Sequence, residues 1–360
     1  MKKWFLLTAA LWIGSGVNGQ DTARIKTLMM EGVQLHERGQ YADAIKKYEE
    51  VLAADPTNIV AQYEKTYSLM ASKKYKEAIE LSQAIIENKD AEPAMIGNAY
   101  STWGSAVDEE GDHKKALKIY DAGIKKVPAY NMLNYNKAIT YFRMNEAGKG
   151  VDELKQSLLK NPRHPASHFL LGRIMYHRRN KMAGMMPLLV YLLYDNKSKR
   201  AEEALTTVRS IVEAGVKQQD SAHYSIDIAP GALVKRSNKS AAADDDFSSM
   251  ELFLGLNAAA AVSKTKEMLP ADRFAYLLKQ VIGNLAEQKG HTGFYGTFYM
   301  PFFTRLHQEA LTESFAHHIF FPTGNVMNEV WVQDHQEQMK ELQAWAMNYK
   351  WPVAAAAGKE

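Results

Sequence analysis

Four histidines in the last sixth of this 360-residue sequence are the side chains best suited to hold a metal ion. His307, His317, His318 and His335 all fall on segments with helical periodicity. Neighbouring residues of a helix point about 100° apart, so His317 and His318 do not face one ion together. Glu313 lies one turn before His317 and offers a second ligand, but a third would have to come from another helix. An intrahelical contact explains the Glu313–His317 pair equally well, and we predict no metal site.

Other catalytic chemistry lacks a recognisable motif. The sequence contains no cysteine, which excludes thiol nucleophiles, thiolate metal sites and disulfides. The patterns His-Glu-x-x-His and Gly-x-Ser-x-Gly, the phosphate loop and the dinucleotide-binding glycines are also missing. We therefore predict that the protein is not an enzyme and has no cofactor. The alternative is an enzyme with an unrecognised site in the C-terminal helical region.

Positive charge is concentrated in one stretch, although the formal net charge of the chain is only +3. Residues 154–194 contain no acidic residue, and their cationic side chains are Lys155, Lys160, Arg163, Arg173, Arg178, Arg179 and Lys181. Such a run either forms a solvated helix face or attracts an anion. A peripheral envelope protein that binds anionic lipid or glycan here, beside the apolar residues 182–194, is a further alternative. Nucleic acid is not a predicted partner, because no nucleic-acid-binding motif accompanies the charge.

An internal repeat organises the first half of the chain. Gly39-Gln40-Tyr41-Ala42-Asp43-Ala44 is followed by Tyr48 and Asp55-Pro56, and the same landmarks return as Trp103-Gly104, Gly111, Ala116, Tyr120 and Pro128. The copies span residues 25–58, 59–92, 97–130, 131–164 and 165–198. Four extra residues sit between the second and third copies, and we place them in the loop around residues 89–93.

This pattern resembles the tetratricopeptide repeat, a helical hairpin of about 34 residues. One hairpin cannot bury its own apolar face, so the resemblance implies a right-handed α-solenoid of about five hairpins over residues 25–198. Residues 199–214 read as a capping helix. In the third repeat, Gly104 is expected to pack the first helix against the second. The predicted fold class is all-α, with a C-terminal helical domain after the solenoid.

The resemblance also implies that the first helix of each hairpin lines the concave side, through its second, fifth, ninth, twelfth and thirteenth positions. The peptide-groove residues that we select at these positions are Tyr63, Tyr67, Asn98, Ser101, Tyr135, Phe142, Arg143, Arg173, Tyr176 and His177. Tyrosine and arginine often dominate binding energy at interfaces; packing against neighbouring helices is the other interpretation of the apolar members. We expect a noncovalent adaptor or scaffold with a protein or peptide partner.

Composition changes after the repeats. Residues 215–246 read as a linker with one short extended piece at 224–228, residues 247–350 as a helical domain, and residues 351–360 as a tail. The helices expected in this domain include 250–262, 270–288, 311–319 and one long helix over 325–349. The aromatic segment 294–303 resembles one found in exported bacterial tetratricopeptide proteins with uncharacterised helical C-terminal domains. We interpret it as a core plug; a ligand shelf is the alternative.

The first nineteen residues differ from the rest. Lys2 and Lys3 precede an apolar run over 4–13 and small residues over 15–19. This order is typical of a cleaved signal peptide, residues 1–19, with a membrane anchor as the alternative. We expect an exported protein of the periplasm or cell envelope. It would not be a lipoprotein, because that anchor requires cysteine. The sequence makes no prediction of the oligomeric state.

Overall fold

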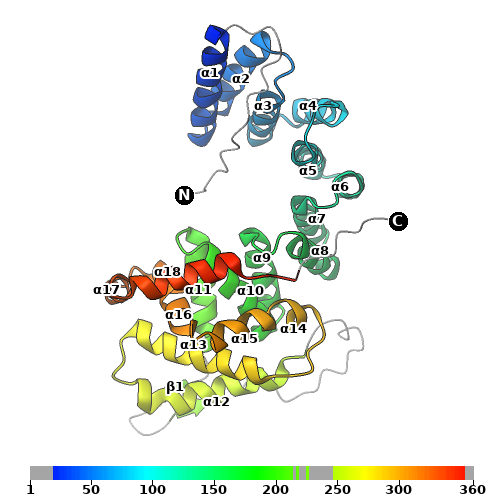
Figure 1. The fold of residues 1–360 in the computed structure, drawn as a ribbon. Coiled ribbons are helices and arrows are strands. Elements are labelled where there is room, and N and C mark those ends of the chain that lie inside the picture. The colour runs from blue at the N-terminus through cyan, green and yellow to red at the C-terminus, as the bar shows by residue number, and fades with distance from the viewer. Residues whose placement is uncertain (1–18, 214–215, 219–223, 227–245, 353–360) are drawn as a thin grey trace. The chain divides into compact units, whose positions relative to one another are not determined.

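The computed structural model describes residues 19–213, 216–218, 224–226 and 246–352 (Figure 1). The predicted signal peptide, except for its last residue, lies outside these ranges, as do most of the predicted linker and almost all of the predicted tail. The described chain is helical apart from one antiparallel pair of short strands, which confirms the all-α class. The pair joins β1 (Val216–Gln218) to β2 (Tyr224–Ile226), with Val216 opposite Ile226. Among the described residues, no helix combines the length and hydropathy that a membrane crossing requires.

Five helical hairpins occupy the predicted repeats. Their first helices are α1 (Gly19–Glu37), α3 (Ile59–Ala71), α5 (Pro93–Glu109), α7 (Asn131–Arg143) and α9 (Pro165–His177). Their second helices are α2 (Tyr41–Ala54), α4 (Tyr75–Glu87), α6 (His113–Lys126), α8 (Ala147–Lys160) and α10 (Lys181–Tyr194). Each second helix packs against the first helix of its own hairpin. In the third repeat a Cβ at Gly104 would overlap the Tyr120 ring, which confirms the predicted close contact.

The turn inside every hairpin has a left-handed backbone at the same repeat position, the fifteenth. Gly39 and Gly111 adopt it with φ of 76° and 92°, and Asn145 with φ of 59°. Lys73 and Arg179 adopt it with φ of 60° and 64°, although their side chains disfavour this region. The repeat register therefore holds through all five copies, including those that have lost most landmark residues.

The predicted position of the four extra residues was wrong. Helix α4 ends at Glu87 and α5 already begins at Pro93, four residues before the repeat boundary at residue 97. Four residues make about one turn of helix, so the insertion extends α5 at its N-terminus. Pro93 suits this first turn because its missing N–H would have no intrahelical acceptor there.

The chain forms two compact units that divide at residue 160, between α8 and α9. The sequence placed the end of the solenoid at residue 198. The structure instead groups the fifth hairpin with the C-terminal helices and not with the first four repeats. Helix α10 is the reason, since its residues Met182 to Leu192 are all buried. Helix α11 (Lys199–Val212) packs against both α10 and α13 (Pro270–Glu287), and is thus an internal layer of this unit.

The remaining helices of the second unit follow in order. They are α12 (Ser248–Thr265), α14 (Phe294–Phe298), α15 (Met300–Gln308), α16 (Thr312–Ile319), the 3-10 turn η2 (Phe321–Thr323), α17 (Val326–Asp334) and α18 (Gln336–Asn348). The predicted single helix over 325–349 is therefore wrong, because it breaks at His335 with φ of −113° and ψ of 36°. The Trp331 carbonyl oxygen accepts from the His335 backbone N–H at 3.0 Å, and the His335 ring nitrogen Nδ1 lies 2.8 Å from the same oxygen.

The aromatic segment is a core plug, as the sequence predicts. Phe298, Tyr299, Phe302 and Phe303 are almost completely buried. Trp351 stacks on Phe302 with ring centroids 4.8 Å apart and planes 10° apart, and is only 8% exposed. The predicted tail over residues 351–360 therefore includes one residue of the core, because the Trp351 indole completes the packing.

A buried histidine joins the fifth hairpin to that plug. His168 of α9 is fully buried; its Nδ1 lies 2.8 Å from the Tyr299 hydroxyl, and its Nε2 lies 2.8 Å from the Pro162 carbonyl oxygen. Burial lowers the pKa of His168 to about 3, so the ring is neutral, with Nε2–H donating to Pro162 and Nδ1 accepting from Tyr299.

Candidate functional site

The surface of α1, α3, α5 and α7 carries seven of the ten predicted groove residues, and we call it the A-helix surface. Consecutive first helices contact one another along it. Arg173, Tyr176 and His177 instead lie on α9, in the second unit. The candidate site is therefore built from residues 19–160, and the three α9 residues are described separately.

Aromatic side chains occupy the part of this surface formed by α1 and α3. Tyr63 and Tyr67 lie one turn apart on α3, with ring centroids 6.0 Å apart. Tyr67 is 47% exposed, whereas Tyr63 is half-buried and burial raises its pKa. The His36 ring lies 5.7 Å from the Tyr67 ring, and its Nδ1 is 2.9 Å from the Ser68 hydroxyl. An exposed aromatic ring held by a row of rings is suited to anchor an apolar side chain.

Tyr130 belongs to this surface but was missed by the sequence analysis. Its ring covers Gly97, where a Cβ would lie 2.5 Å from the Tyr130 Cγ, and its hydroxyl donates to Asn98 Oδ1. Tyr130 is the last residue of its repeat, outside the five positions from which groove residues were chosen. Asn98 is thereby held by the protein itself through its oxygen.

The middle of the A-helix surface is a hydrogen-bonded network. Asn136 of α7 donates from Nδ2 to the hydroxyl of Ser101 at 2.6 Å and to that of Ser105 at 3.3 Å. The Ser105 hydroxyl also lies 3.1 Å from the Tyr120 hydroxyl. Ser101, one of the predicted groove residues, is thus already bound to the next repeat.

Ionic contacts form the end of the surface. Arg143 donates to Asp108 Oδ2 and to Glu109 Oε1, both at 2.5 Å. Asp108 is only 4% exposed and also contacts His113 Nδ1 at 2.7 Å. Burial opposes the charge of Arg143, but its two carboxylate partners outweigh burial and raise its pKa. Arg143 therefore links α7 to α5 and is not a free cation for a ligand.

Phe142 and Tyr135 have different surroundings. A Cβ at Gly150 would overlap the Phe142 ring, so Phe142 packs inside its own hairpin, as the packing interpretation of the apolar groove residues predicts. Tyr135 is half-buried on α7.

Two of the three α9 residues, Arg173 and Tyr176, contact α11. Arg173 lies 3.8 Å from Glu203 and its guanidinium carbon 5.9 Å from the Phe169 ring centroid. The Tyr176 hydroxyl is 3.2 Å from the Ser210 hydroxyl, and the His177 ring packs edge-on against Tyr176. Arg173, Tyr176 and His177 thus form a local cluster of their own.

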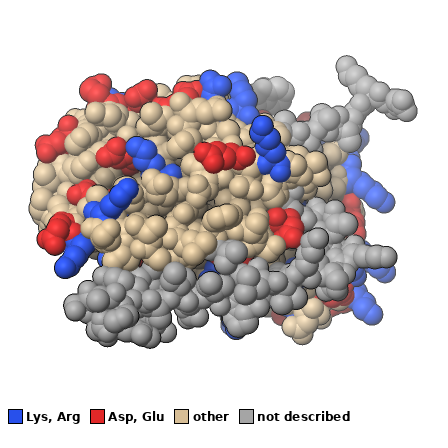
Figure 2. All heavy atoms as spheres, turned by 90° about the horizontal axis from the view of Figure 1, so that it is seen from below, with Lys and Arg blue, Asp and Glu red and all other residues tan. Residues whose placement is uncertain are grey.

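Two cations of the basic stretch are hydrogen-bonded to uncharged groups of the protein. The Arg163 guanidinium reaches the backbone carbonyls of Met347 and Tyr349, and Lys160 donates to Asn134 at 2.7 Å. The exposed Arg178 and Arg179 form no ion pair with any residue that the structure describes. On the face shown in Figure 2, positive and negative side chains are interspersed, so a field of one sign does not cover it.

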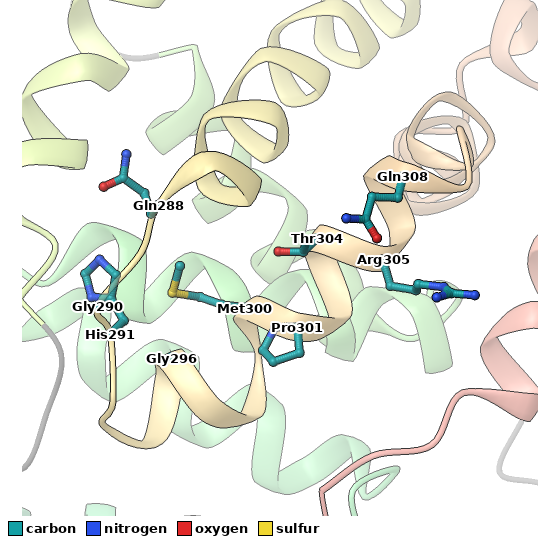
Figure 3. A pocket seen from close by; sticks show the side chains of 9 residues that line it. All are labelled: Gln288, Gly290, His291, Gly296, Met300, Pro301, Thr304, Arg305 and Gln308. Atoms are coloured by element: carbon teal, nitrogen blue, oxygen red, sulfur yellow. The ribbon is translucent and has the colours of Figure 1, made fainter.

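A pocket of about 310 Å³ lies in the second unit, between the end of α13 and helices α14 and α15 (Figure 3). Its lining includes His291, Gly296, Met300, Thr304 and Arg305. Arg305 is bound to Glu309 at 2.5 Å, and Figure 3 shows its side chain pointing away from Met300. The volume is at the lower limit for small-molecule sites.

The histidines near the C-terminal end do not share one centre. Over the described parts of the chain, no group of three potential metal ligands comes together. His318 lies 3.1 Å from the Leu193 carbonyl oxygen, whereas His317 contacts Asn328 and stacks on Trp331, with ring centroids 3.7 Å apart. Burial is the main cause that lowers the pKa of His317.

The comparison with known proteins agrees with this geometry. Residues 35–96 match the sequence profile of the tetratricopeptide repeat family. The chain therefore contains tetratricopeptide repeats. No curated protein matches the sequence.

Solved structures with similar hairpins cover about half of this tetratricopeptide-repeat chain. A thermophilic tetratricopeptide protein of Thermus thermophilus is 17% identical, covering 51% of this chain and 98% of its own, with a TM-score of 0.42. PilF of Pseudomonas aeruginosa is 13% identical, covering 53% and 90%, with a TM-score of 0.41. YrrB, described as having an unusual peptide-binding site, is 13% identical, covering 52% and 97%, with a TM-score of 0.33.

Proposed function

We propose that this protein is a noncovalent adaptor of the cell envelope that binds an extended or helical peptide segment along its A-helix surface. Tetratricopeptide hairpins are protein-interaction modules, and their stacked first helices form a binding surface. The observation that carries the proposal is Tyr67, an exposed aromatic ring fixed between Tyr63 and His36. Such preordered rings bind with little loss of side-chain entropy.

Much of the remaining surface is already committed to internal bonds. The network around Ser101 and the ion pairs of Arg143 link successive repeats. We therefore assign anchoring to the tyrosines of α3 and assign Ser101, Phe142 and Arg143 to the support of the surface. Envelope location remains part of the proposal and rests on the composition of residues 1–19.

Site-specific photocrosslinking tests the proposal. A photoreactive phenylalanine analogue at Tyr67 should capture a partner in the native envelope, whereas the same analogue at Lys114, an exposed residue of α6, should not. Mass spectrometry identifies the captured segment. Replacing both Tyr63 and Tyr67 with alanine should then weaken binding of a synthetic copy of that segment by more than about 2 kcal/mol. Equal capture at positions 67 and 114 would overturn the proposal.

The apolar residues on which the membrane-binding alternative depends are buried. Residues 182–192 form the buried interior of the second unit and are not available to lipid while that unit is folded. Arg178 and Arg179 stay exposed, and an anionic envelope component remains a candidate second ligand at that turn. Binding to vesicles with and without anionic lipid, at low and high salt, tests this candidate.

A further inference from the structure

As far as the structure describes the chain, helix α12 is covered on one side only. Its buried side chains recur every three or four residues and face the rest of the second unit: Met250, Leu254, Ala258, Ala261 and Thr265. The element with which it packs most extensively is α13. Figure 1 shows α12 (yellow-green) at the outer edge of this unit. The opposite side of the helix is therefore exposed.

That exposed side is apolar over much of its length. Phe253, Leu256 and Ala260 are exposed and are spaced three and four residues apart, so they share one face of the helix. Phe253 is 49% exposed and Leu256 is 41% exposed. A single exposed apolar side chain is ordinary, but a row of them on one helix indicates an interaction surface.

A second exposed apolar group lies at the α12–α13 connection, residues 266–269. Two backbone hydrogen bonds fix this connection. The Met268 N–H donates to the Thr265 carbonyl at 3.1 Å, and the Arg273 N–H donates to the Leu269 carbonyl at 2.9 Å. Met268 and Leu269 are nevertheless exposed. The connection thus presents two ordered apolar side chains to solvent.

Positive charge borders this apolar surface. Three exposed cations flank the connection: Lys264, Lys266 and Arg273. Within the described ranges, their side chains form no ion pair or hydrogen bond. The acids nearby in the sequence are Glu267 and Asp272, and Asp272 lies 3.7 Å from the His317 ring. The connection therefore combines an apolar centre with cations that the protein does not neutralise by direct contact.

We propose that α12 and the α12–α13 connection dock on a membrane surface that contains anionic lipid. Met268 and Leu269 enter the boundary between headgroups and acyl chains, and Phe253 and Leu256 lie along it. The three flanking cations bind the headgroup phosphates. This inference goes beyond the proposed function, because it adds a lipid-binding surface on the second unit, whereas the A-helix surface belongs to the first.

The shape and the charge of this surface favour lipid over a protein partner. The apolar side chains protrude from a helix and a tight connection, and they do not line the pocket of the second unit. Apolar anchors at protein interfaces fill shaped pockets of the partner, whereas a fluid bilayer accepts protruding side chains in any arrangement. A basic border around an apolar centre complements an anionic headgroup layer above an acyl interior.

An environment-sensitive fluorophore at the connection tests the proposal. Because the chain has no cysteine, Leu269→Cys accepts a single thiol-reactive dye. The labelled full chain is mixed with phosphatidylcholine vesicles, with or without phosphatidylglycerol. We expect the emission to shift to the blue with phosphatidylglycerol, at an apparent affinity at least about tenfold above that for neutral vesicles, and the shift to weaken with salt. The dye reports its own surroundings, so lipid binding by the apolar residues 4–13 does not produce the signal.

The matched control carries the dye at Met347→Cys, another exposed apolar position of the same unit, and its emission should stay unchanged. In the Leu269→Cys chain, glutamine at all three flanking cations should lower the apparent affinity at least about tenfold without loss of helical circular dichroism. Glutamine at Arg178 and Arg179, the other exposed cations without ion pairs, should leave it unchanged.

Three results would overturn the inference: unchanged emission at position 269, an equal shift at position 347, or wild-type affinity after loss of the three flanking cations. An equal loss of affinity on replacing Arg178 and Arg179 would overturn it as well, because the attraction would then not be local. The assay uses lipid alone, so these results leave the peptide capture proposed at Tyr67 to its own test.

Discussion

At the scale of single residues, spacing in the sequence predicts contacts best where both partners lie in one hairpin. The close packing of the two helices at Gly104 was predicted correctly, because a glycine facing a tyrosine sixteen residues later is a property of the hairpin itself. Tyr130 and Asn136 were missed as contributors because their partners lie on α5, beyond the intervening helix α6, and the landmark residues of the repeat do not mark such contacts.

Replacing Gly104 with leucine tests that close contact. A side chain there would overlap the Tyr120 ring, and overpacking of this kind costs about 1–3 kcal/mol. We expect Gly104→Leu to lower the melting temperature, with Lys114→Leu on the exposed side of α6 changing little. Equal melting temperatures for the two variants would contradict the observed packing.

The half-buried carboxyl of Glu64 predicts a stability that depends on pH. Its pKa is about 7 in the folded protein, above the ordinary value of 4.5, so the folded state binds the proton more tightly than the unfolded state. The contribution of Glu64 to the free energy of unfolding is fully present below about pH 4.5. It decreases by up to about 3 kcal/mol as the pH rises to about 7.

The variant Glu64→Gln separates this contribution from other titrations. The difference in free energy of unfolding between variant and wild type should grow in favour of the variant from pH 4.5 to pH 8. Urea denaturation at several pH values measures it, and a difference independent of pH would show that Glu64 is solvated.

At the scale of elements, periodicity predicted most helices but not their interruptions. The helix expected over 325–349 has a continuous apolar pattern, and that pattern does not mark the change of backbone angles at His335. The extra turn of α5 was likewise placed in a loop, because an inserted turn and an inserted loop of four residues look alike in a pattern of period 34.

The turn at the fifteenth position of each repeat offers a stabilising substitution. Lys73 has φ of 60°, where a side chain costs about 1–2 kcal/mol relative to glycine. Lys73→Gly should therefore raise stability by about 0.5–1 kcal/mol, after the greater flexibility of glycine in the unfolded chain is subtracted. Thermal denaturation checks this, with Gly39→Ala as the opposite change. A lower melting temperature for Lys73→Gly would show that the lysine side chain has a stabilising contact.

At the scale of the whole molecule, the sequence predicted the solenoid and the helical C-terminal region but not the boundary between units. The fifth repeat keeps the repeat length, so its pattern alone groups it with the other four. Its actual partners, Tyr299 and Trp351, lie far along the chain, and the contact of His168 with them follows from tertiary packing only.

Removal of the Trp351 indole should destabilise one unit selectively. Trp351→Ala deletes a buried ring stacked on Phe302 and should cost about 3–5 kcal/mol. Hydrogen exchange should then accelerate in α9 and α15 and stay unchanged in α1 to α6. Met347→Ala, at a side chain that is 73% exposed, is the matched control. Uniform acceleration in both units would contradict the division at residue 160.

The burial of Trp351 against the elements around His168 also sets an order of events during synthesis. Each of the first four hairpins has its packing partners within its own or the adjacent repeat, so these repeats can acquire structure while the ribosome is still translating. The fifth hairpin is made next but must wait, with the apolar surface of α10 exposed, until the indole that closes its core has been added. During that interval the nascent chain is most in need of a chaperone.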